Sequence, residues 1–218
     1  MTGRRYDFLS GFVLAGGESR RMGQPKHWLV LGGETLLDRQ VRLLRSVCHS
    51  VAVIGLPEGL SRADVPFMAD AIPGRGPVGG IYTGLLRTRT EFNLFLGCDL
   101  PFVTARFLDY LARRAAQGGA VATAPEMPAG GVQPLCAVYR RAALAAVRAN
   151  LEAGQNKAQT LVGRLRSAVI PWQEIACAGY SPRIFANINT PADYEATKAI
   201  LNWSSWDSGA ERPAGANS

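Results

Sequence analysis

The stretch Leu14-Ala15-Gly16-Gly17-Glu18-Ser19-Arg20-Arg21-Met22-Gly23-Gln24-Pro25-Lys26 decides how the chain is interpreted. An apolar run from Phe8 to Ala15 drops into two adjacent glycines, a pattern typical of a buried strand that opens onto exposed backbone N–H groups. Ligands bind at this end of a strand in open α/β sheets. Arg20, Arg21 and Lys26 would repel each other in one short loop, so their convergence indicates a polyanion such as a nucleoside triphosphate.

The spacing in this loop excludes two common phosphate-binding motifs. It is not a Walker A loop, because the spacing differs and no Ser or Thr follows Lys26. It does not match the dinucleotide pattern G-x-G-x-x-G either. From the residues alone, a strand-loop-helix junction with two solvated arginines stays an equal alternative.

Outward from this loop, apolar runs and helical periodicities alternate along the chain. Thr104 and Thr190 are predicted N-caps, with Pro191 at the first helical position and Asp193 completing a capping arrangement. The alternation predicts an α/β fold with a mostly parallel central sheet in three layers. We expect strands at residues 11–15, 51–54, 65–69, 93–97, 120–124, 134–139 and 167–172, and helices at 35–47, 80–86, 104–117, 142–151, 157–165 and 190–201.

Composition restricts the class of protein and its partners. The 218 residues, 47% hydrophobic and 19% charged, suit one domain over residues 1–202, followed by a Ser/Gly/Ala/Pro-rich tail, 203–218, that we expect to be disordered. A net charge of +7 favours an anionic partner. The basic residues are scattered and no aromatic ladder accompanies them, which argues against nucleic acid.

The cysteines and the apolar runs predict a cytoplasmic protein. Cys48, Cys98, Cys136 and Cys177 lie far apart without a C-x-x-C pair, as expected for buried thiols in a reducing compartment. No secretory apolar segment is present near the N-terminus, and no apolar run approaches the roughly 18 residues of a membrane span. We therefore expect no membrane partner.

Two aspartates stand where predicted strands end. Asp99 follows the strand at 93–97 and precedes Leu100-Pro101, so it would share a crevice with the glycine loop. Mg²⁺ is held by one or two carboxylates plus phosphate oxygens and waters, so Asp99 is a candidate metal ligand. The alternative is an aspartate that starts a turn. Asp70 ends another short strand, and its alternative is a solvated loop position.

These features together resemble the MobA-like nucleotidyltransferases from about Gly11 to Leu201. The family signature is roughly L-A-G-G-x-S-x-R-M-G-x-D-K, and this chain departs from it at Pro25, where Asp is commoner. Further matches are a G-P-L-x-G loop at residues 76–80, C-D-x-P at 98–101 and N-x-N-T-P at 187–191. The resemblance implies a three-layer, Rossmann-like nucleotidyltransferase fold.

The resemblance also implies roles for individual residues. Catalytic groups would be Arg21, Lys26 and Asp99, with Mg²⁺ on Asp99. The nucleotide site would comprise Leu14, Ala15, Gly16, Gly17, Lys26, Asp70, Gly80 and Asp99, and the second substrate would lie near Asn187 and Asn189. Two departures weaken the choice of base and acceptor: Ile54-Gly55 replaces a nucleotide-binding Asn, and Gln133 replaces a His.

The activity implied is transfer of GMP from GTP to molybdenum-bound molybdopterin, with release of pyrophosphate. Molybdoenzymes or their chaperones would receive the product. Family alternatives are a CTP-dependent molybdopterin cytidylyltransferase and a sugar-phosphate nucleotidyltransferase.

Two alternatives come from other classes. One is a non-catalytic GTP-binding protein. The other is a dinucleotide-dependent oxidoreductase, because Gly74–Gly79 formally matches G-x-G-x-x-G and Asp99 lies 20 residues past Gly79. No long strand precedes Gly74, so we expect this segment to be a loop before the helix at 80–86.

Overall fold

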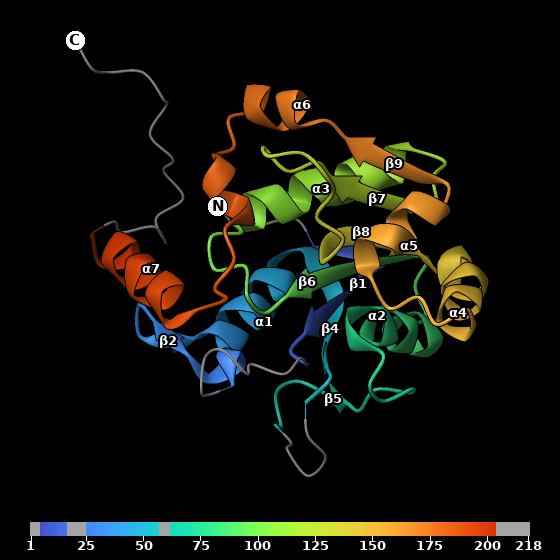
Figure 1. Ribbon diagram of the computed structural model, residues 1–218, viewed down its shortest axis with the longest axis horizontal. Coiled ribbons are helices and arrows are strands. Elements are labelled where there is room, and N and C mark those ends of the chain that lie inside the picture. The colour runs from blue at the N-terminus through green and yellow to red at the C-terminus, as the bar shows by residue number, and fades with distance from the viewer. Residues whose placement is uncertain (1–4, 17–24, 57–61, 204–218) are drawn as a thin grey trace.

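The computed structural model describes residues 5–16, 25–56 and 62–203. Its main element is a seven-stranded sheet with the order β5-β4-β1-β6-β8-β7-β9 (Figure 1). Within this sheet β8 runs antiparallel to both of its neighbours, whereas the other pairings are parallel. The strands are β1 (Tyr6–Leu14), β4 (Cys48–Ile54), β5 (Phe67–Met68), β6 (Phe92–Gly97), β7 (Ala122–Pro125), β8 (Cys136–Arg140) and β9 (Ser167–Ile170).

Helices cover both faces of the sheet, as the predicted three layers require. One face packs against α1 (Leu36–Val47), α3 (Ala105–Gln117) and α6 (Trp172–Cys177). The other packs against α2 (Gly76–Arg87), α4 (Leu144–Glu152) and α5 (Ala158–Arg164). The remaining elements are the antiparallel pair β2 (Val30–Leu31) and β3 (Glu34–Thr35), the 3₁₀ turns η1 (Lys26–Trp28), η2 (Arg141–Ala143) and η3 (Pro182–Phe185), and α7 (Pro191–Trp203).

The buried strand β1 shows why the sheet has two cores. Successive side chains of a strand point to opposite faces. Leu9 and Val13 therefore pack with α1 and α3, while Phe12 and Leu14 pack with α2 and α5. A strand buried on both faces is apolar almost throughout, as expected for the centre of a parallel sheet.

The predicted caps at Thr104 and Thr190 are confirmed, and Thr35, predicted as the first helical residue, is the cap of α1. The Thr35 and Thr104 hydroxyl oxygens accept from the backbone N–H groups of Asp38 and Phe107 at 3.0 and 3.2 Å. At α7 the Thr190 hydroxyl accepts from the Asp193 N–H at 3.2 Å, and the Asp193 carboxylate accepts from the Thr190 N–H at 2.8 Å. This is the reciprocal arrangement predicted for residues 190–193.

Several predicted elements were wrong in extent: the strand predicted at 11–15 begins at Tyr6, and the strand predicted at 65–69 is reduced to Phe67–Met68. The helix predicted at 80–86 begins at Gly76, so the G-P-V-G-G segment is its first turn and not a loop. Pro77 suits the first turn of a helix, Gly76 has a φ of +56°, and tight packing explains Gly79 and Gly80. The strand predicted at 167–172 ends at Ile170, because Pro171 caps α6, a helix that the periodicity did not reveal.

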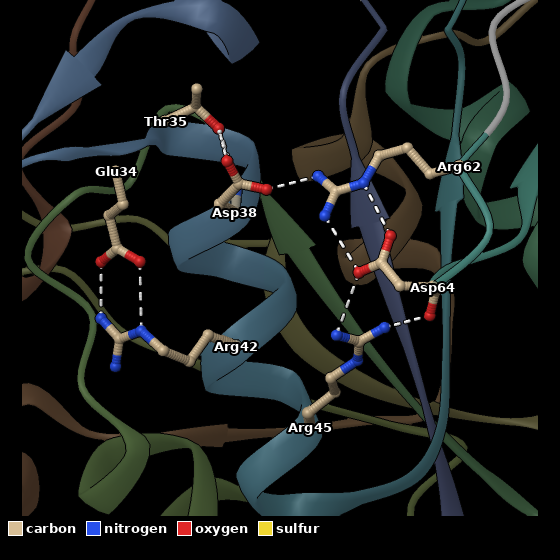
Figure 2. A network of polar contacts seen from close by, with 7 residues as sticks. All are labelled: Glu34, Thr35, Asp38, Arg42, Arg45, Arg62 and Asp64. Carbon is tan, nitrogen blue, oxygen red and sulfur yellow. Dashed lines mark hydrogen bonds and ion pairs between the residues drawn. The ribbon is translucent and has the colours of Figure 1, made fainter.

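A charged network fixes the connection between β4 and β5 on the outer side of α1 (Figure 2). Arg62 binds both oxygens of Asp64 at 2.8 and 2.9 Å and also pairs with Asp38 on α1. Arg45, one helical turn from the end of α1, pairs with the same Asp64 carboxylate at 3.2 Å. The chain that leads toward β5 and Asp70 is therefore anchored on α1.

Cysteine burial agrees largely with expectation. Cys48, Cys98 and Cys136 are buried free thiols, whereas Cys177 is exposed. Burial raises the pKa of the Cys136 thiol to about 12. Within residues 5–16, 25–56 and 62–203, every helix is too short or too polar to cross a bilayer.

The domain limits 1–202 and the disordered tail stay predictions. Trp203 is the last residue of α7, and residues 204–218 of the predicted tail lie outside the described residues.

Candidate active site

A cleft opens where the parallel strands end. Leu14 at the end of β1 stands in register with Ile54 of β4 on one side and Gly97 of β6 on the other. After α1, β4 and β5, the chain crosses back through α2 to place β6 on the opposite side of β1, which makes this the switch point of the sheet. The cleft measures about 780 Å³ and is lined by Leu14, Ala15, Gly16, Lys26, Ile54, Gly55, Asp70, Gly74, Gly76, Pro77, Gly80, Gly97, Cys98, Asp99 and Leu135.

One wall of the cleft is a contact between two backbones. A Cβ on Gly55 would lie 2.8 Å from the Gly16 Cα, and one on Gly16 would lie 3.0 Å from the Gly55 oxygen. Gly55 also has a φ of +88°, which favours glycine over any residue with a side chain. The absence of Asn at this position is therefore accounted for, because Gly55 contributes backbone alone.

The start of α2 forms the adjoining wall. A Cβ on Gly80 would lie 2.7 Å from the Leu14 Cδ2 atom, so glycine lets α2 approach the end of β1. Gly76 and Pro77 in the first turn also line the cleft. Unpaired N–H groups at a helix N-terminus favour anions, which suits phosphate oxygens. Gly80 thus lies where it was predicted, although within a helix.

Asp99 lies on the floor of the cleft, directly beyond β6. Its side chain is only 25% exposed, and a Cβ on Gly97 would come within 2.9 Å of its Oδ1 atom. Burial raises the pKa of Asp99, and the Lys26 ammonium offsets part of that rise. The Asp99 carbonyl accepts from the Ile188 N–H at 3.0 Å, which ties this position to the segment before α7.

Asp70 faces the cleft from beyond β5. Its Oδ1 atom is buried and has no hydrogen-bond partner among the described residues. Burial raises the pKa of this carboxyl group. A buried acceptor without a partner lowers the stability of the folded protein. The Asp70 oxygen can therefore accept a hydrogen bond from a ligand.

Lys26 completes the charged part of the site. Its Nζ atom lies 3.7 Å from Asp99 Oδ2 and donates to Asn189 Oδ1 at 2.8 Å. The lysine predicted from the end of the loop thus lies beside the predicted metal ligand. Asn187 and Asn189 are both exposed and neither lines the cleft, but Asn189 is joined to the site by this hydrogen bond from Lys26.

Comparison with known proteins settles the family. The sequence model described as the MobA-like NTP transferase domain matches residues 11–169. The chain belongs to this family. The NTP transferase fold is also seen in a crystal structure titled molybdopterin-guanine dinucleotide biosynthesis protein A from Archaeoglobus fulgidus, with a TM-score of 0.79, 24% identity, and coverage of 89% of this chain and 100% of the other.

Relatives with assigned names align with most of this NTP transferase. A protein of Chloroflexus aggregans named "Probable molybdenum cofactor guanylyltransferase" is 37% identical over 88% of this chain and 95% of its own length. A protein of Natronomonas pharaonis with the same name is 34% identical over 88% of this chain and 98% of its own.

Two predicted site residues of this NTP transferase, Gly17 and Arg21, lie outside the described residues. Gln133, which replaces the family His, accepts from the Leu135 N–H at 3.2 Å and so supports the entry to β8. The Gly74–Gly79 segment follows a two-residue edge strand and leads into α2 at Gly76. That geometry differs from a dinucleotide fingerprint, in which the glycines follow a long strand directly.

His27 is a site residue that the sequence interpretation left as a solvated or packing position. The structure buries it, with 8% exposure. Burial lowers the pKa of His27, and the polar backbone of Ala15 opposes that shift. The sequence signal for a role of His27 was its position directly after Lys26, because a histidine there can pack against the end of β1.

The described residues present a small set of charged groups to a ligand. Among them no cluster of three His, Cys, Asp or Glu side chains is suited to hold a metal alone. A single carboxylate beside a lysine fits Mg²⁺ that takes its other oxygens from phosphates and water. The arrangement can bind a nucleoside triphosphate and neutralise its charge.

Proposed function

We propose that this chain is a molybdenum cofactor guanylyltransferase, which transfers GMP from GTP to molybdopterin. The observation that carries the proposal is the likeness to relatives with that name, at up to 37% identity over 88% of the chain. The cleft adds physical support, because it joins glycine-lined backbone, a lysine and two aspartates at the switch point.

The proposed reaction is a displacement at phosphorus. An oxygen of the acceptor's terminal phosphate attacks the α-phosphorus of GTP and forms a new P–O bond. The bond from the α-phosphorus to the oxygen that bridges to the β-phosphate breaks, and pyrophosphate leaves with that oxygen. A phosphate monoester has a second pKa of about 6, so the nucleophile is already an anion at neutral pH and needs no general base.

Charge neutralisation by this chain would then supply much of the rate. The Lys26 ammonium lies at the cleft and would bind triphosphate oxygens as negative charge shifts to the departing pyrophosphate. Arg21 is proposed for the same task from the family signature. Asp99 is the proposed ligand of Mg²⁺, which when bound would offset the negative charge of the phosphates.

Guanine is favoured as the base by the chemistry of Asp70. A carboxylate accepts hydrogen bonds, and guanine offers adjacent N–H donors on its pairing edge. Cytosine has one amino donor there beside two acceptors, which a carboxylate would repel. The buried Asp70 Oδ1 atom, which has no partner among the described residues, supports this assignment. Cytoplasmic localisation stays a prediction from the cysteines and the apolar runs, and delivery of the product to molybdoenzymes or chaperones stays a prediction from the resemblance.

The proposal is tested by pyrophosphate release from GTP and from CTP, each with Mg²⁺ and molybdopterin-loaded acceptor. Release with GTP and little with CTP is expected. Release with CTP alone would make the protein a cytidylyltransferase with the same mechanism. Tight GTP binding without release would show that the acceptor is wrong.

A further inference from the structure

The ammonium group of Lys26 is held between two elements that are far apart in the chain. Asp99 follows β6 and lies 3.7 Å from Lys26 Nζ, whereas Asn189 precedes α7 and accepts from it at 2.8 Å. The contact with Asn189 is the shorter one. The amide oxygen of Asn189 therefore directly influences the position of the Lys26 ammonium group.

Asn189 is itself held in place by backbone hydrogen bonds. Its N–H donates to Asp193 Oδ2 at 2.9 Å, within the capping arrangement of α7. The hydrogen bond from the Asn189 N–H is the largest cause that lowers the pKa of Asp193, so this carboxylate stays ionised at neutral pH. The preceding Ile188 is fully buried and its N–H donates to the Asp99 carbonyl at 3.0 Å.

These contacts form a continuous path from the start of α7 to the nucleotide cleft. Asp193 positions the Asn189 backbone, the Asn189 amide oxygen accepts from Lys26, and Lys26 faces Asp99. Figure 1 shows α7 beside β2, away from α2 and α4. The path therefore connects a helix at the periphery of the molecule with the cleft. The Tyr194 hydroxyl strengthens that placement by donating to the Val30 carbonyl at 2.7 Å.

We propose that Asn189 is a positioning residue for the nucleotide donor, which acts through Lys26, and that it is not primarily a contact for the second substrate. The inference rests on the proposed function. Lys26 already pairs with Asp99 at 3.7 Å, and without the amide oxygen the ammonium would move closer to that carboxylate. That pair would occupy both groups that the metal and the triphosphate need.

Asn187 provides a matched control in the same segment. It is exposed, it lies two residues from Asn189, and no contact joins it to Lys26 in the described part of the chain. Both positions were assigned to the second substrate by resemblance, but the structure connects only Asn189 with the donor side.

The first experiment measures equilibrium binding of GTP with Mg²⁺ to the whole protein, without any acceptor. Asn189→Ala is expected to raise the Kd about tenfold, because the ammonium would no longer be held in place for the triphosphate. Asn187→Ala is expected to leave this Kd unchanged. Thermal unfolding of both variants is compared with wild type to exclude a folding defect.

The second experiment places Asn189→Ala in a Lys26→Met background. If Asn189 acts through Lys26, its substitution weakens GTP binding no further once the ammonium is absent. A role limited to the packing of α7 would instead give additive effects and a lower melting temperature.

Three outcomes would overturn the inference. They are unchanged GTP binding by Asn189→Ala with a raised KM for molybdopterin alone, equal effects of Asn187→Ala and Asn189→Ala, and additivity with Lys26→Met. Wild-type protein that binds no nucleoside triphosphate would instead refute the proposed function, and the inference with it.

Discussion

The cleft and the outer side of α1 both carry aspartates, but the two sets lie in opposite environments. In the cleft, Asp70 and Asp99 are half-buried, and burial raises the pKa of both. One oxygen of Asp70 has no hydrogen-bond partner in the part of the chain that the structure describes. Beside α1, Asp64 is exposed and its hydrogen bonds from Arg62 hold its pKa low. Asp38 is affected by burial too, but hydrogen bonds from Thr35 and Arg62 prevail and lower its pKa (Figure 2).

The difference separates carboxylates that await a ligand from carboxylates that the protein has already paired. Structural ion pairs are satisfied within the fold, so they need nothing from solution. A ligand site must keep unused hydrogen-bonding capacity in the free enzyme, at some cost in stability. Among the aspartates with shifted pKa values, the two with raised values are therefore the ones that line the cleft, in agreement with the general association of such shifts with function.

The largest expected effect is on catalysis, from Asp99→Asn. The rate of GMP transfer should fall about 10³-fold or more, because the proposed metal ligand and its charge are lost. The melting temperature should stay equal or rise, since a partly buried charge is removed. Steady-state pyrophosphate release and thermal unfolding measure the two. Wild-type transfer rates in this variant would refute the role of Asp99.

A smaller effect is expected from Asp70→Asn. We expect the KM for GTP to rise about tenfold and the preference for GTP over CTP to shrink, because the amide replaces an acceptor oxygen by a donor. Kinetics with both nucleotides measure this. An unchanged preference would assign Asp70 to a part of the nucleotide that GTP and CTP share.

The two sets of aspartates should also have opposite pH dependence of stability. Asp70 has a raised pKa in the folded state, so the native protein binds more protons from pH 3.8 up to that pKa, and stability falls as pH rises through this window. Asp38 has a lowered pKa, so its contribution is present above pH 3.8 and is lost as pH falls through the folded value.

Urea unfolding between about pH 3 and 6 tests this difference in nucleotide-free protein. The stability of wild type minus that of Asp70→Asn should decrease with pH, and wild type minus Asp38→Asn should increase. Difference curves of the same sign would contradict the distinction between the two sets.

The smallest effect is expected from Asp38→Asn at neutral pH. Loss of the charge beside Arg62 and at the start of α1 should reduce stability by at most about 1 kcal/mol, and less at high salt, because 38% of the Asp38 side chain is exposed and solvent screens the pair. Transfer activity should stay at the wild-type level. A large loss of activity would mean that the network controls the cleft and does not merely anchor the β4–β5 connection.

Local patterns were enough to predict much of the fold. The runs that became β1, β4 and β6 are mostly apolar, and Thr35 and Thr104 cap helices. The start of α2 was missed because Gly76, Gly79 and Gly80 oppose a helix locally, while the close contact of Gly80 with Leu14 comes from elsewhere in the chain. The short helix α6 was missed for lack of a full period.

The sequence by itself determined the order of strands and helices, the glycine loop at the end of β1 and the two aspartates that follow strands, because these depend on neighbouring residues. Only the tertiary structure decided that Gly16 and Gly55 touch, that His27 is buried against Ala15, and that Asn189, but not Asn187, holds Lys26. Those contacts join segments up to 163 positions apart, and local propensity carries no information about such distances.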